Sequence, residues 1–181
     1  MYGDFSISPE SLEQVAAGDI KKRPAPLPEP EAPVNSPAQE QAERDVIRTY
    51  MAFPILFLKT YERLNPELVQ TAEFRLIYEK SIQQFEDDLV FLPEKLLSYI
   101  DNSEQAGRVA EYMHADVMDE EQAEAVNRES VRFILLKNYE REEIKLKAQY
   151  MQAESAGDEI GARKFVSLLD IIQKQKHALV R

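Results

Sequence analysis

The dominant pattern in this sequence is an apolar side chain at every third or fourth position, from about Gln39 to the C-terminus. That spacing lines one face of an α-helix, whereas a half-buried strand requires apolar and polar residues to alternate. No convincing alternating segment is present. The pattern therefore predicts an all-α fold, in which a small helical bundle is followed by an antiparallel hairpin of two long helices.

Five short helices are predicted between residues 39 and 118, with ends marked by prolines and capping residues. Pro54 separates the first two helices, Pro93 begins the fourth, and Asn102 or Ser103 caps the fifth. Asn65-Pro66-Glu67 predicts a short turn before the third. The predicted helices span residues 40–51, 55–64, 72–85, 93–100 and 103–113. The side chains expected in their core are Ala42, Val46, Ile47, Tyr50, Phe74, Ile77, Tyr78, Ile82 and Phe85.

The last third of the chain predicts the hairpin, over residues 119–181. Residues 119–155 contain neither proline nor glycine, which predicts one helix of about 37 residues, roughly 55 Å long. Gly157 then provides a stop, and Asp158 caps a second helix over residues 159–179. The first half of the long helix is expected to pack on the bundle through Val126, Phe133, Ile134, Leu135 and Leu136.

The N-terminal part of the chain has a different composition. Six of the ten prolines lie between Pro24 and Pro37, so residues 24–38 are interpreted as a semi-rigid linker. Residues 1–23 are interpreted as the remnant of a preceding domain, with one short helix that begins at Ser8-Pro9 and ends near residue 17.

The second helix of the hairpin has more apolar surface than one neighbouring helix needs. On a helical wheel its large apolar side chains cover an arc of roughly 180–200°, whereas packing on one partner helix requires about 100°. Ile160 and Ile171 extend this arc. Burial of one such side chain stabilises by roughly 1.5–3 kcal/mol, so the arc predicts either a docking surface for another protein or packing on the bundle or a second copy.

Charge narrows the possible partners. The chain has 33 acidic and 22 basic side chains and a formal net charge of −11, which disfavours direct binding of this region to nucleic acid. Residues 163–181 nevertheless contain five basic residues and one acidic residue. The helix dipole accounts for cations near a helix C-terminus, and an acidic partner surface is the alternative. With no membrane span, no secretory signal and no cysteine, a cytoplasmic location is expected.

No catalytic arrangement is supported by the sequence. Glu111 and His114 form an ExxH spacing, but a di-iron bundle needs that element twice with two further glutamates, and Lys174 stands where the glutamate of His177 would be. A cluster of acidic residues lacks the glycine of a calcium loop and suits a solvated helix start: Asp116, Asp119, Glu120, Glu121 and Glu124. No phosphate-binding loop is present. We therefore expect no enzyme activity, no metal and no cofactor for this region.

The order of these elements resembles the C-terminal, helicase-binding region of a bacterial replicative DNA primase (DnaG-type). The segments that carry the resemblance are Ile7–Leu12, Ala42-Glu43-Arg44 with the helix that follows, Glu73–Glu79, and Gln152–Asp158 with Leu169–Ile172. The resemblance implies a noncatalytic domain that docks through its hairpin onto the N-terminal collar of the hexameric replicative helicase and recruits primase to the replication fork. The expected partner-binding residues are Tyr139, Tyr150, Met151, Phe165, Leu168, Leu169 and Ile172.

Three other interpretations stay open at this point. The chain is also similar to the N-terminal domain of the replicative helicase itself, which has the same bundle. A coiled-coil homodimerisation module is the second possibility, and a small four-helix metal oxidase, disfavoured by its ligand count, is the third.

Overall fold

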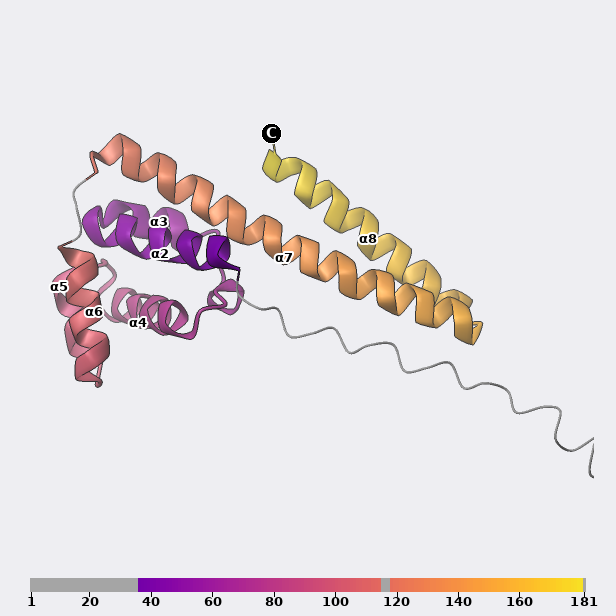
Figure 1. The fold of residues 1–181 in the computed structure, drawn as a ribbon, viewed down its shortest axis with the longest axis horizontal. Coiled ribbons are helices and arrows are strands. Elements are labelled where there is room, and N and C mark those ends of the chain that lie inside the picture. The colour runs from indigo at the N-terminus through magenta and orange to yellow at the C-terminus, as the bar shows by residue number, and fades with distance from the viewer. Residues whose placement is uncertain (1–35, 115–117, 181) are drawn as a thin grey trace, which may run out of the picture. The chain divides into compact units, whose positions relative to one another are not determined.

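The structure is a computed structural model that describes residues 36–114 and 118–180. These residues belong to one compact unit and, where they form regular structure, are helical, which confirms the predicted all-α fold (Figure 1). The predicted helix near Ser8 and most of the predicted linker lie outside the described residues. The elements are α2 (Pro37–Ala52), α3 (Ile55–Tyr61), η1 (Pro66–Leu68), α4 (Ala72–Asp88), α5 (Pro93–Leu96), η2 (Leu97–Tyr99), α6 (Ser103–Met113), α7 (Glu120–Ala156) and α8 (Glu159–Val180).

Several helices of the bundle differ from the predicted bounds. α4 ends at Asp88 rather than residue 85, and the helix predicted over residues 93–100 is the short α5 followed by the 3-10 turn η2. α2 begins at Pro37 rather than residue 40, because the Ser36 hydroxyl caps it by accepting from the Gln39 amide at 3.2 Å. Two residues of the predicted linker are therefore helical. α3 ends at Tyr61 rather than residue 64, because the chain turns there to bury Leu64, whose carbonyl accepts a 2.8 Å hydrogen bond from the Tyr78 hydroxyl.

Aromatic rings form the centre of the bundle core. The Phe57 ring stacks on Phe91 with centroids 4.4 Å apart and meets Tyr50 edge-on at 5.4 Å. The Tyr50 hydroxyl lies 3.1 Å from that of Ser81, and burial raises the pKa of this tyrosine far above its usual value. The predicted core residues are buried, except that Ile82 and Phe85 are half-buried and pack against the cluster.

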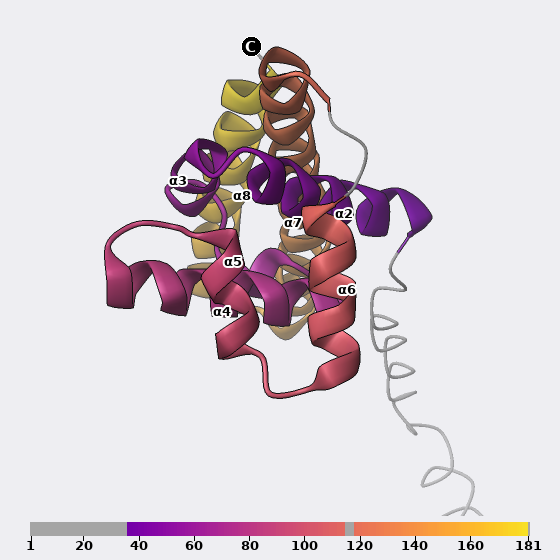
Figure 2. The same ribbon diagram turned by 90° about the vertical axis from the view of Figure 1, so that its left-hand side faces the viewer.

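α7 belongs to both the bundle and the hairpin. α2 packs along its N-terminal half and contacts α4 and α6 on its other side (Figure 2). Ile134 is buried there, and Phe133 and Leu135 pack against the core as predicted, whereas Val126 and Leu136 are half-buried. Two further residues of α7 are buried in the core although the sequence analysis did not select them: Ala123 and Val131.

A buried polar network fixes α7 against the bundle. The Asn127 amide donates to the hydroxyls of Thr49 at 2.9 Å and Thr60 at 3.1 Å. Both threonine hydroxyls also bond to backbone carbonyls of their own helices, Thr49 to Val46 and Thr60 to Leu56. Because these buried groups have partners, the network specifies how α2, α3 and α7 meet.

Candidate protein-docking surface

The hairpin turn is built by two adjacent residues. Gly157 has a φ of 73°, and its amide and that of Asp158 return to the carbonyls of Glu154 and Ala153 at 3.1 and 2.9 Å. This pair of bonds closes the last turn of α7 in a left-handed conformation that favours glycine. The Asp158 carboxylate then accepts from the Gly161 amide at 2.9 Å and caps α8.

The seam between α7 and α8 is narrow. Among the described residues of α8 only Ile172 is buried, and Ala153 is the buried residue of α7 beyond Ile134. A Lys176–Glu143 ion pair of 2.8 Å crosses the seam, and Lys147 bonds to the same carboxylate at 2.6 Å. The hydrogen bonds from Lys147 and Lys176 lower the pKa of Glu143 to about 2, so this carboxylate is ionised at neutral pH.

The seven side chains predicted to contact a partner differ in exposure. Met151 is 62 % exposed, whereas Ile172 is buried in the seam. The other five are half-buried: Tyr139, Tyr150, Phe165, Leu168 and Leu169. Phe165 and Leu168 precede Ile172 by seven and four residues and therefore lie on its side of α8. The centre of the predicted apolar arc is thus used in packing α8 on α7.

One edge of that arc stays exposed. Ile160 is 85 % exposed and Ile171 is 49 % exposed, as the width of the arc predicted. Three more apolar residues of the hairpin are exposed and were not expected from the sequence: Ile144, Val166 and Val180. A helical wheel places Val166 near Leu169. The wheel does not show that Val166 stays exposed when α8 packs on α7. The hairpin therefore presents apolar side chains to solvent on several flanks.

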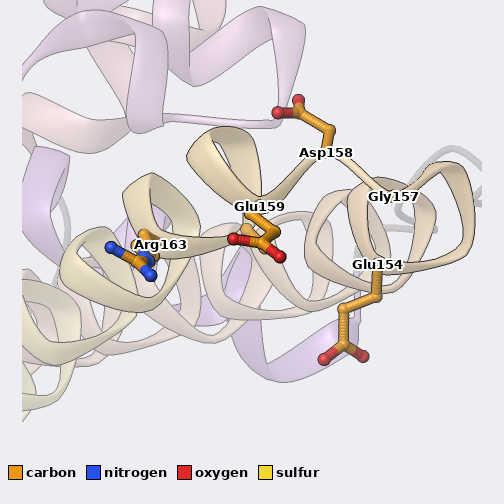
Figure 3. Close-up of a pocket in the computed structure, with 6 residues that line it drawn as sticks. Glu154, Gly157, Asp158, Glu159 and Arg163 are labelled. Carbon is orange, nitrogen blue, oxygen red and sulfur yellow. The ribbon is translucent and has the colours of Figure 1, made fainter.

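A shallow hollow of about 640 Å³ lies at the hairpin turn, between the end of α7 and the start of α8 (Figure 3). The carboxylates of Glu154 and Asp158 point in different directions there. Glu154 accepts a hydrogen bond from the Tyr150 hydroxyl, and Asp158 caps α8. Their oxygens therefore do not converge on one point in the hollow.

The bundle also has exposed apolar side chains that were not expected from the sequence. Three are on α3 and two follow α4: Ile55, Leu58, Tyr61, Leu89 and Val90. The two segments meet because Tyr61 contacts Phe85 and Phe57 stacks on Phe91. The signal in the sequence was that α3 is apolar on nearly all sides, which one buried face does not explain.

The residues considered for metal binding are not grouped. His114 follows α6 and is exposed, as is Glu111. Asp119 caps α7 through the Gln122 amide, and Glu124 pairs with Lys59 at 2.7 Å. Asp116 lies outside the described residues. Within residues 36–114 and 118–180 no three His, Cys, Asp or Glu side chains are placed to hold a metal ion.

Across the described helices, none has both the length and the apolar character needed to cross a bilayer. No family model and no curated protein matches this chain.

Proposed function

We propose that this chain is a noncatalytic interaction domain of a bacterial DNA primase, which docks through its α7–α8 hairpin onto the N-terminal collar of the hexameric replicative helicase. The single observation that carries the proposal is the low burial of α8. This helix has 22 residues, yet Ile172 is its only buried side chain among those the structure describes. Large apolar residues such as Ile160 and Ile171 remain in water.

Burial energetics support a partner for this surface. Each large apolar side chain that a partner covers contributes roughly 1.5–3 kcal/mol, so a few of them are enough for a specific contact. The bundle does not bury the apolar side chains of α8, because its apolar core ends at Leu135 and includes no described residue of α8. The order of a short-helix bundle followed by a long hairpin is also the layout on which the resemblance to primase was based.

Recruitment of a primer-synthesising domain is the second part of this proposal. The prolines from Pro24 to Pro33, which precede α2 in the sequence, would act as a spacer that keeps such a domain within a limited distance of the docked hairpin. Tethering raises the local concentration of that domain without any new contact. A weak hairpin contact would then be sufficient to keep a primer-synthesising domain near the helicase.

A binding titration tests the proposal. The labelled chain is titrated with the replicative helicase of the same organism, alongside a chain that ends at residue 137. Because the core cluster ends at Leu135, the shortened chain should keep the bundle, which circular dichroism and thermal unfolding would verify. We expect saturable binding of the full chain and none of the shortened one. Equal affinities, or no binding of the full chain, would overturn the proposal. A stable dimer that fails to bind helicase would favour a homodimerisation module instead.

A further inference from the structure

The side of α8 that faces away from α7 combines apolar and basic side chains. At about 100° per residue, Ile160, Lys164 and Ile171 lie within about 40° of one another, and Arg163 and Lys174 lie within about 60° on the other side of Ile160. All five are exposed. We call these five residues the outer face of α8. The remaining positions on this side of the helix are small, which allows a partner to approach closely: Ser167 and Ala178.

The positive charge of the outer face is only partly neutralised by described residues of the chain. Lys174 pairs with Asp170 at 2.6 Å, at the border of the face. Arg163 and Lys164 form no ion pair with a described residue. No acidic side chain lies on the arc between Arg163 and Lys164 around the helix. The face is therefore locally basic although the chain has a net charge of −11.

We infer, building on the proposed function, that the outer face of α8 is the contact surface and that it fits an acidic, apolar groove between two helices of the partner. Ile160 and Ile171 enter the apolar floor of the groove. Carboxylates on its rim pair with Lys164 on one side and Arg163 on the other. Partly desolvated charge pairs of this kind fix orientation and raise the association rate, while the isoleucines supply the buried area.

The same charges argue against two other occupants. A twofold contact between two copies of this face would bring lysines and arginines against one another, because the face has no acid to meet them. Nucleic acid would leave both isoleucines against a charged backbone, and the net charge of the chain repels phosphates. An acidic protein groove satisfies both kinds of side chain.

The test uses the full chain and the hexameric replicative helicase at low and moderate salt. Lys164→Glu and Ile171→Ser change the outer face. The matched controls are Lys145→Glu, at an exposed position of α7, and Val166→Ser, on another flank of α8. We expect each outer-face variant to weaken binding about tenfold and each control less than about twofold. Added salt should weaken binding of the unmodified chain and have less effect on Lys164→Glu.

The outcomes separate this inference from the function on which it rests. No binding by the unmodified chain overturns both. Binding that the outer-face variants and the controls affect equally overturns this inference and leaves hairpin docking in place. Binding of a labelled single-stranded oligonucleotide that Lys164→Glu abolishes would also overturn it. All four substituted positions are exposed, so circular dichroism should show unchanged helix content in each variant.

Discussion

At the scale of single residues, the buried carboxylate of Glu43 connects two helices. Its side chain is fully buried, and its oxygens accept from the Gln39 side chain at 2.7 Å and from the backbone amides of Gln70 and Thr71 at 2.7 and 2.9 Å. Those two amides lie just before α4, at the positive end of that helix. Glu43 of α2 thus caps the N-terminus of α4, although it lies 27 residues before Gln70 in the sequence.

Replacing Glu43 with alanine is expected to destabilise the bundle by about 2–3 kcal/mol, because two backbone amides would lose their acceptor. Glu40→Ala, at a partly exposed position of the same helix, removes only a surface pair with Arg44 and should cost less than about 0.5 kcal/mol. Urea unfolding of both variants gives the comparison. Losses of similar size would show that Glu43 does not cap α4.

Sequence periodicity found the apolar core residues but not residues such as Glu43. Phe74, Ile77 and Tyr78 recur at helical spacing, so their burial follows from local order. The partners of Asn127 lie 67 and 78 residues away, and nothing in the spacing of apolar positions identifies them. The burial of these polar residues could therefore not be predicted from the sequence, because it depends on how the helices pack.

At the scale of elements, the two glycines at residues 107 and 157 have opposite roles. Gly157 adopts a positive φ that ends α7, whereas Gly107 lies inside α6 with open space around the position of a Cβ. Gly157→Ala should destabilise the protein by about 1 kcal/mol, because alanine disfavours the left-handed region. Gly107→Ala should stabilise it by about 0.5–1 kcal/mol through helix propensity. Thermal unfolding distinguishes the two, and a shift in the same direction for both would contradict this account.

Some helix ends, such as the start of α6 and the stop at Gly157, were predictable from the sequence. The ends of α3 and α4 and the exposed faces of the hairpin were not. Capping residues such as Asn102 and Asp119 act on amides two or three residues away, so the sequence contains the whole interaction. The direction in which α8 meets α7 depends on the geometry at Gly157 and Asp158 instead. The helical wheel predicts the width of the apolar arc on α8. It does not predict that α8 packs on α7 through the side that bears Ile172 rather than the side that bears Ile160, because that choice depends on the conformation of the turn.

At the scale of the whole molecule, stability should be unevenly distributed. The bundle has an aromatic core and a satisfied polar network, while the described part of the hairpin beyond Leu135 buries only Ala153 and Ile172. We expect amides of α8 and of the C-terminal third of α7 to exchange with solvent deuterium through lower-energy openings than amides of α2 and α4. Hydrogen exchange with mass spectrometry measures this, and bound helicase should slow exchange in the hairpin selectively. Uniform protection across both parts would contradict the prediction.

One unbroken helix, α7, joins the bundle to the hairpin turn. About 20 residues of α7 lie between Leu135 and the turn, a stiff rod of ~30 Å with no break along it. The bundle holds this rod only at its N-terminal end, through the buried side chains from Ala123 to Ile134 and the hydrogen bonds of Asn127. A small change in the angle of α7 at those contacts would therefore displace the hairpin turn by a much larger distance.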